Sequence, residues 1–325
     1  MSNESHSSIF REFYSEQAFV DRFEKEPERG VDVIIPVMHT NELWHSNLIS
    51  IYREIPVNRL MLGDGGVVDD SLEIAKKFPR VVIFDHRSFT SLGFSIRKLI
   101  ESVDTTWFVY LHSDVYLPEG WFDTMEKYQK TYDWYQCRQQ LTVQVEYDPY
   151  SHDAYISRAY SGSQMGRKDA FKAVLPQIDD DYLYRNEDII IAHLIEREGL
   201  KYGHVDEIFH YHQLMHKVSK WERELKSVDL HTNLSAEEDL RANMTFIKGL
   251  IKYSQPNNPV LIDAVKTCGK KMYELNQISS GELRQWTKDT NPVWLKYLPR
   301  QHKIINRTIY FLKTIYKKLK KLIIS

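Results

Sequence analysis

The chain has 325 residues, of which 42% are hydrophobic and 27% charged, with a formal net charge of −2. These values are typical of a folded globular protein and exclude a disordered, collagen-like or disulfide-scaffold chain. The charge is uneven, because residues 301–325 carry seven Lys and Arg and no Asp or Glu, which leaves −9 for the first 300 residues. A mildly acidic body argues against general nucleic-acid binding, and the basic tail indicates an anionic partner.

The two cysteines, Cys137 and Cys268, lie too far apart in the sequence to suggest a metal motif or a disulfide framework. We therefore expect a reducing compartment. The N-terminal residues lack a signal-peptide pattern, and no run approaches the about 20 apolar residues of a membrane span. The expected location is the cytoplasm, at the inner face of the membrane if the tail binds lipid.

Four short apolar, β-branched runs predict buried strands, at 31–37, 59–62, 81–84 and 107–111. Helical periodicity fills the intervals, at about 42–54, 69–78 and 92–103. This alternation predicts an α/β fold with a mostly parallel central sheet flanked by helices. Ligands of such sheets bind at the carboxyl ends of the strands, and polar or glycine-rich segments follow every strand here.

The rest of the chain alternates less regularly. A helix is expected before the first strand, at 8–26. The later segments are predicted as a helix at 121–131, strand structure at 134–147, a loop at 149–159, helices at 169–174 and 187–198, a strand at 205–209 and a mostly helical region at 216–300.

Four groups of residues could carry chemistry. Asp114 ends His112-Ser113-Asp114 after the fourth strand, and a carboxylate there could hold Mg²⁺ or Mn²⁺, or cap a turn. Asp64 and Gly65 follow the second strand and could contact a base or ribose, or form an ordinary glycine turn. The other two groups are Glu187-Asp188 and His210-Tyr211-His212.

Glu187 and Asp188 open a predicted helix, where a carboxylate could be a general base or merely a cap. His210 and His212 share one face of a strand, because side chains alternate along it. Two imidazoles near a carboxylate site are candidate metal ligands, although a structural role stays open.

The order of these motifs resembles the family 2 glycosyltransferases with the GT-A fold. The matching segments run from Val-Asp-Val-Ile-Ile-Pro-Val, through Leu-Met-Leu-Gly-Asp-Gly-Gly, Leu-Gly-Phe-Ser-Ile-Arg-Lys and Phe-Val-Tyr-Leu-His-Ser-Asp-Val, to Asn-Glu-Asp and His-Tyr-His, over about residues 31–215. The resemblance implies a nucleotide-sugar lying over the strand ends. It also implies Mn²⁺ or Mg²⁺ as the cofactor.

The resemblance assigns roles to individual residues. Donor contacts would come from the ends of the first strands and the following helix, namely Val37, His39, Asp64, Gly65 and Arg97, with Arg97 near the diphosphate. Asp114 would bind the metal, with His212 or His210 beside it. Asp188, with Glu187, would supply the catalytic base that deprotonates an acceptor hydroxyl, giving an inverting transfer.

The chain departs from the family pattern in two places. His112 stands where the usual Asp-x-Asp motif has its first acid, and Gly63-Asp64-Gly65-Gly66 replaces Asp-Asp-Gly-Ser. The Gln-x-x-Arg-Trp signature of processive synthases does not occur, which favours transfer of a single sugar. The alternatives are a non-catalytic nucleotide-sugar or glycan-binding protein on a degenerate GT-A fold and, less favoured, a sugar nucleotidyltransferase.

The expected organisation has four parts: an N-terminal helical extension at 1–30, the catalytic domain at 31–215, a helical region at 216–300 and a terminal helix at 301–325. The terminal helix pairs an apolar stripe with Lys and Arg, a pattern that suits an anionic membrane surface. It could instead dock on the body or on a partner subunit. A membrane location would favour a lipid-linked acceptor over a free glycan.

Overall fold

A computed structural model describes most of the chain, namely residues 27–38, 40, 43–88, 92–144, 155–175, 187–215, 236–257, 259–274 and 280–299. It divides into two compact units, Met1–Gly249 and Leu250–Ser325. The helices predicted at 8–26 and 301–325 lie outside the described residues. The boundary predicted between residues 215 and 216 borders another such stretch and stays a prediction.

The first unit is built on one eight-stranded sheet with the order β3-β2-β1-β4-β7-β6-β8-β5. Its strands are β1 (Val31–Val37), β2 (Val57–Asp64), β3 (Val81–Asp85), β4 (Trp107–Leu111), β5 (Val115–Tyr116), β6 (Trp134–Gln144), β7 (Tyr155–Arg167) and β8 (Tyr202–Met215). The pairings among β1 to β4 are parallel, as is β6 with β8, whereas β7 runs antiparallel to both neighbours and β5 antiparallel to β8. The predicted α/β fold class is confirmed.

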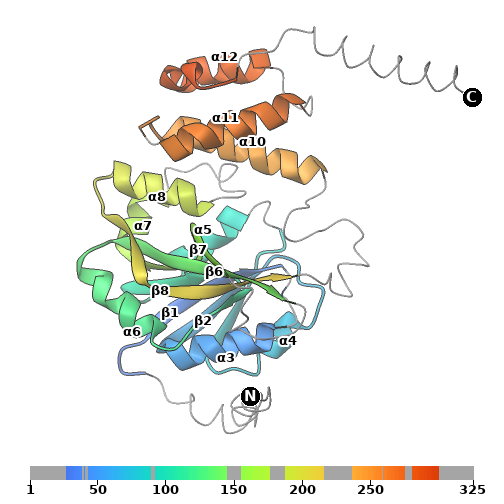
Figure 1. Ribbon diagram of the computed structural model, residues 1–325. Coiled ribbons are helices and arrows are strands. Elements are labelled where there is room, and N and C mark those ends of the chain that lie inside the picture. Colours follow the sequence, from blue (N-terminus) through green and yellow to red (C-terminus); the bar gives the residue numbers. More distant parts are fainter. Residues whose placement is uncertain are drawn as a thin grey trace, which may run out of the picture. The chain divides into compact units, whose positions relative to one another are not determined.

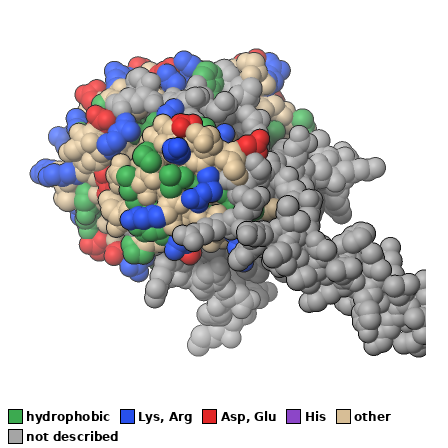
Figure 2. All heavy atoms as spheres, turned by 90° about the horizontal axis from the view of Figure 1, so that it is seen from above, with side chains coloured by type: hydrophobic (Ala, Val, Ile, Leu, Met, Phe, Trp, Pro, Cys, Tyr) green, Lys and Arg blue, Asp and Glu red, His purple; other side chains and the backbone are tan. Residues whose placement is uncertain are grey.

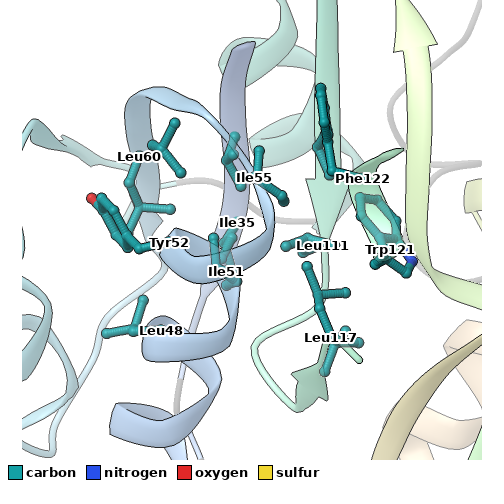
Figure 3. Close-up of a cluster of buried hydrophobic side chains, with 14 of the residues drawn as sticks. Ile35, Leu48, Ile51, Tyr52, Ile55, Leu60, Leu111, Leu117, Trp121 and Phe122 are labelled. Atoms are coloured by element: carbon teal, nitrogen blue, oxygen red, sulfur yellow. The ribbon is translucent and has the colours of Figure 1, made fainter. Parts of the chain in front are cut away.

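Helices cover both faces of this sheet (Figure 1), with α3, α4 and α6 on one face and α5, α7 and α8 on the other. Their bounds are α3 (Trp44–Glu54), α4 (Ser71–Ala75), α5 (Leu92–Glu101), α6 (Trp121–Glu126), α7 (Lys168–Val174) and α8 (Glu187–Arg197), with a 3₁₀ turn, η1, at Lys127–Lys130. Strand β1 is buried on both faces, which explains why its sequence is apolar except at Asp32 instead of alternating. Figure 3 shows the core on the α3 side, where Ile51 of α3 and Ile55, which directly follows α3, lie near Ile35 of β1.

A buried carboxylate ties the first strands together. Asp32 of β1 is 0% exposed and accepts hydrogen bonds from the Arg59 guanidinium, at 2.6 and 3.2 Å, and from the Asn58 amide. The backbone N–H of Asp104, just before β4, donates a further bond at 2.7 Å. Burial alone would raise the pKa of Asp32, but these bonds and the charge of Arg59 lower it overall.

Two strands differ from the sequence prediction. The segment predicted as a loop at 149–159 enters β7 at Tyr155, and β8 extends well beyond the predicted 205–209. The β7 sequence is rich in Ser, Gly, Arg and Gln and lacks the apolar alternation of a strand. Its structure comes from pairing with β4 and β6 on either side, a tertiary effect that outweighs weak intrinsic propensity.

The second unit is helical, as predicted for 216–300 in the part of that range that the structure describes. It contains the end of α10 (Ala236–Tyr253), then α11 (Pro259–Glu274), α12 (Ser280–Thr290) and the 3₁₀ helix η4 (Pro292–Lys296). Trp294 is fully buried, and its indole N–H donates to the carbonyl of Ser254 at 3.1 Å. The Asn291 amide bonds the carbonyl of Ile251 at 2.9 Å, so α12 and η4 are joined to the end of α10 by hydrogen bonds as well as by packing.

Basic side chains gather on the surface of this unit. Figure 2, which views the molecule from the side of α12 in Figure 1, shows Lys and Arg around apolar side chains on that face. Lys296 and Lys266 both place their ammonium groups over the ring of Tyr297, at 4.7 and 5.9 Å from its centroid. Among the described residues, no helix combines the length and the apolar character that crossing a membrane requires.

Candidate functional site

Three side chains meet where β4 and β5 approach β8. His112 and Asp114 lie between β4 and β5, and the pairing of Val115 with His212 brings β8 alongside. His212 Nε2 lies 3.1 Å from Asp114 Oδ2, and the rings of His112 and His212 are 5.8 Å apart, edge to face. Each of the three residues offers one ligand atom, and these atoms all lie within 4.8 Å of one another. We call these residues the His–Asp–His cluster.

The cluster has the chemistry of a cation site. Two imidazole nitrogens and one carboxylate oxygen are standard ligands for divalent metals, and three protein ligands leave positions open for a substrate. His112 Nε2 is buried, and no described residue hydrogen-bonds to it. A buried nitrogen without a partner is costly unless something binds it, so the donor set fits a divalent cation.

Charge inside the cluster is balanced between Asp114 and His212. Burial would raise the pKa of Asp114, but the adjacent His212 imidazole lowers it overall, so the carboxylate stays ionised. Burial would lower the pKa of His212, yet Asp114 raises it. Burial lowers the pKa of His112, which keeps that imidazole neutral and able to coordinate.

A glycine makes room for the histidines. Gly162 of β7 has φ +89°, and a Cβ placed there would lie 3.0 Å from His210 Nε2 and 3.2 Å from His212 Nδ1. The Gly162 carbonyl also accepts the backbone N–H of His112 at 2.9 Å. One residue therefore anchors the backbone of His112 and leaves space for the His212 ring, and its positive φ disfavours any side chain.

His210, predicted as a metal ligand together with His212, faces a different group. Its Nδ1 lies 2.7 Å from Ser163 Oγ and 3.6 Å from Cys137 Sγ, and all three side chains are fully buried. Burial raises the pKa of Cys137 to about 11, so its thiol stays neutral and inert. His210 is not in the His–Asp–His cluster but its ring lies beside it, 5.7 Å from that of His212.

Glu187 is held by a tyrosine. It opens α8, is 3% exposed, and accepts a hydrogen bond from Tyr110 Oη at 2.9 Å. Burial and the Glu187 carboxylate raise the pKa of Tyr110 well above its ordinary value, so the phenol stays protonated and donates. Glu187 Oε1 also lies 3.9 Å from His112 Nε2, which places this acid at the border of the His–Asp–His cluster.

Asp188 is 7% exposed and follows Glu187 at the start of α8. Its charge acts on Tyr110, as do those of Glu187 and Asp114. Three acids therefore place negative charge near one phenol at the end of β4.

The predicted donor residues lie at the same edge, at the ends of β1 and β2. Val37 pairs with Asp64, and its carbonyl accepts the N–H of Gly65 at 2.7 Å. Asp64 Oδ1 accepts the N–H groups of Gly66 and Val67, at 2.9 and 2.8 Å, so this carboxylate also shapes its own loop. Beside this loop, Met38 is 65% exposed.

The other two residues predicted to contact the nucleotide-sugar donor are Arg97 and His39. Arg97, in the middle of α5, pairs with Glu101 one turn later, with 3.2 Å between Nε and Oε1. That contact directs it along the helix, and its role toward a diphosphate stays a prediction. His39 lies outside the described residues.

Sequence reasoning missed four contributors to this site: Tyr110, Gly162, Ser163 and Gln139, whose Oε1 lies 2.8 Å from His212 Nδ1. It also treated His112 as a lost ligand, whereas the structure brings that imidazole beside Asp114 and His212. The spacing His-x-Asp with a later His was a usable signal for this group. The other four depend on strand pairing and have no local signature.

Comparisons with known proteins give similarities at low identity. No protein-family model and no curated protein matches the chain. Among solved structures, Staphylococcus aureus TarS in complex with UDP-GlcNAc is 11% identical with a TM-score of 0.49, covering 83% of this chain and 82% of that one. The mannosyltransferase PcManGT from Pyrobaculum calidifontis, in complex with GDP-Man and Mn²⁺, is 12% identical with a TM-score of 0.46, covering 88% and 94%.

The bifunctional IspDF from Campylobacter jejuni is 14% identical with a TM-score of 0.38, covering 55% of this chain and 49% of that one. This chain therefore aligns with about half of the IspDF chain. Identities of 11–14% establish no activity here, so the function is argued from the residues of the site.

Proposed function

We propose that this protein is an inverting, non-processive glycosyltransferase of the family 2 type. It moves a sugar from a nucleoside-diphosphate donor to an acceptor hydroxyl. The observation that carries this proposal is the juxtaposition of a divalent-cation donor set, His112, Asp114 and His212, with two buried acids at the start of α8. A non-catalytic nucleotide-sugar binder has no use for a buried, oriented base.

The position in the sheet supports the same proposal. The chain builds β1, β2 and β3 outward on one side, then returns to add β4 on the other side of β1. The carboxyl ends of β1 and β4 are thus a topological switch point, where ligands of open α/β sheets bind. Asp64 and Gly65 border this point from β2, and the His–Asp–His cluster borders it from β4.

The mechanism follows from the protein's own groups. Asp188 accepts the proton of the acceptor hydroxyl, whose oxygen forms a bond to the anomeric carbon as the bond from that carbon to the diphosphate oxygen breaks. Glu187, fixed by Tyr110, orients this end of α8 and faces His112. His112, Asp114 and His212 would hold Mn²⁺ or Mg²⁺, which when bound supplies positive charge for the departing diphosphate. Attack opposite the leaving group inverts the anomeric centre.

The donor would lie over β1 and β2. Asp64, at the end of β2, would accept from the base or ribose, with Gly65 and Val37, which are hydrogen-bonded to each other, beside it as the floor of the donor site. A Cβ at Gly65 would come within 3.3 Å of the Val37 carbonyl, so a larger residue would crowd this floor. Arg97 and His39 are assigned to the donor by family resemblance.

The acceptor would be a glycan or lipid-linked hydroxyl at the cytoplasmic face of a membrane. Residues 250–325 carry 15 Lys and Arg against four Asp and Glu, a formal charge of +11, so the chain's total of −2 leaves −13 for residues 1–249. Such a separation of charge favours an anionic surface as the partner of the C-terminal part. The segment 301–325 would lie on that surface as a basic amphipathic helix.

The test is donor hydrolysis and sugar transfer by the full chain across a panel of nucleotide-sugars, with Mn²⁺ or Mg²⁺. We expect one nucleotide class to be consumed and its nucleoside diphosphate released. The matching diphosphate should raise the melting temperature, because a ligand that binds the native state stabilises it. Asp114→Ala should abolish both effects.

The matched control is Asp123→Ala, which removes an exposed acid on α6. Nucleotide binding without turnover in any metal would favour the non-catalytic alternative. Release of pyrophosphate from a nucleoside triphosphate and a sugar phosphate would indicate a nucleotidyltransferase. No binding of any nucleotide by the folded chain would refute the site assignment.

A further inference from the structure

We infer that the His–Asp–His cluster selects a first-row transition-metal ion over Mg²⁺ and Ca²⁺. This inference rests on the metal site of the proposed function and goes further, because it names the class of ion from the ligands of this chain. The family resemblance implies Mn²⁺ or Mg²⁺ without choosing between them, with Asp114 as a ligand and a later histidine beside it. Here two of the three candidate ligands are imidazoles.

Ligand type decides the ion. Mg²⁺ and Ca²⁺ are hard cations that take oxygen ligands, whereas imidazole nitrogen suits Fe, Ni, Cu and Zn, and Co²⁺ lies between Fe²⁺ and Ni²⁺ in the order of intrinsic affinity. Among the described residues, Asp114 is the one carboxylate in the cluster. Glu187 already accepts a hydrogen bond from Tyr110 and lies 3.9 Å from His112 Nε2. A hard cation would therefore gain one carboxylate oxygen where a transition ion gains an oxygen and two nitrogens.

The surroundings prepare His212 for coordination. Gln139 Oε1 lies 2.8 Å from His212 Nδ1, and because an amide oxygen only accepts, Nδ1 must carry the proton. The other nitrogen, Nε2, is hydrogen-bonded to Asp114 Oδ2 at 3.1 Å and would coordinate once a metal ion displaces that proton. A hydrogen-bonded second nitrogen is the usual arrangement behind a metal-binding histidine.

The site is also held rigidly. The His112 backbone is bonded to the Gly162 carbonyl, and the His210 ring packs beside the His212 ring with its own Nδ1 bonded to Ser163. Ligand atoms within 4.8 Å of one another need little movement to surround an ion at about 2.1 Å, where opposite ligands are about 4.2 Å apart. The two imidazoles therefore lie close to coordinating positions before a metal ion binds.

The test is metal binding by the full-length chain without nucleotide, using Co²⁺, Mn²⁺ and Mg²⁺ alone. We expect one Co²⁺ per chain, bound at least about tenfold more tightly than Mg²⁺, with Mn²⁺ between them in the order of intrinsic affinity. Equilibrium dialysis gives the affinities, and the visible absorption of Co²⁺ reports its ligand field. Equal affinity for Co²⁺ and Mg²⁺ would overturn the inference.

His112→Asp is the decisive variant, since it converts His-Ser-Asp into Asp-Ser-Asp. We expect it to weaken Co²⁺ binding by at least about tenfold and to strengthen Mg²⁺ binding. His204→Gln is the control, because His204 lies on strand β8, as His212 does, but outside the His–Asp–His cluster. This substitution should change neither affinity. An unchanged ratio of Co²⁺ to Mg²⁺ affinity in His112→Asp would contradict the inference.

A second measurement does not depend on the variant folding. Pulsed EPR of the wild-type chain loaded with Mn²⁺ should detect ¹⁴N couplings from two imidazoles, and their absence would refute the ligand set. The proposed function can fail separately. Sugar transfer by a chain that binds Mg²⁺ and Co²⁺ equally would refute the metal preference and leave the proposed function standing. Preferential binding of Co²⁺ without sugar transfer from any donor would refute the proposed function and leave the metal preference standing.

Discussion

Replacing Gly162 with alanine should damage the candidate site through two effects that can be separated. The first is backbone strain, since φ is +89° and a left-handed conformation costs a residue with a Cβ about 1–2 kcal/mol. The second is overpacking, since the new methyl group would lie 3.0 Å from His210 Nε2 and 3.2 Å from both His212 Nδ1 and Val115 Cγ2. Forcing extra volume into a packed site typically costs about 1–3 kcal/mol.

The two effects together predict a loss of about 2–5 kcal/mol in the free energy of unfolding. The matched control is Gly120→Ala, because Gly120 has a similar φ of +76° but no atom within 4 Å of the added Cβ. It should cost only the strain, about 1–2 kcal/mol. Urea denaturation of wild type and both variants gives the three free energies, and the difference between the variants isolates the contact with the histidines.

Cobalt binding by the same proteins completes the experiment. Gly162→Ala should weaken Co²⁺ binding, because the displaced His212 ring is a candidate ligand, whereas Gly120→Ala should leave it unchanged. Equal destabilisation by the two substitutions would show that the histidines do not pack against β7. Normal metal affinity in a destabilised Gly162→Ala would show that His212 is not a ligand.

Three further predictions concern buried carboxylates. Tyr110→Phe removes the phenol that donates a hydrogen bond to Glu187 and should lower the free energy of unfolding by about 1.5–3 kcal/mol, measured by urea denaturation; no loss would mean that the bond to Glu187 does not form. Asp188→Asn should lower kcat for sugar transfer by about 10²–10⁴-fold with little change in donor KM, and a larger effect from Glu187→Gln would transfer the role of base to Glu187. Because the pKa of Asp32 is lower in the folded chain than the ordinary 3.8, its contribution to stability is complete above pH 3.8 and is lost as the pH falls through the folded value. The difference in stability between wild type and Asp32→Asn, from urea denaturation at several pH values, should therefore shrink in acid, and a constant difference would refute it.

The sequence alone determined the first half of the sheet and the acids at its edge. Strands β1, β2 and β4 are mostly buried and the edge strand β3 is half-buried, and each contains a short apolar run that the sequence pattern reveals. The helix that begins at Glu187 was equally visible, because a helix is a local structure whose apolar residues repeat every 3.6 positions. The polar residues that follow each strand then pointed to one edge of the sheet as the candidate site, since all parallel strands end on the same side.

The tertiary structure decided what those residues contact. Strand β7 has no apolar alternation, and only its pairing between β4 and β6 makes it a strand and places Gly162 against the histidines. Asp114 meets His212 across 98 residues, and Tyr110 meets Glu187 across 77. Contacts over such separations depend on strand order and register, which local periodicity does not encode. For the same reason His112 read as a missing acid in the sequence, whereas the fold sets its imidazole beside Asp114 and His212 as a candidate ligand.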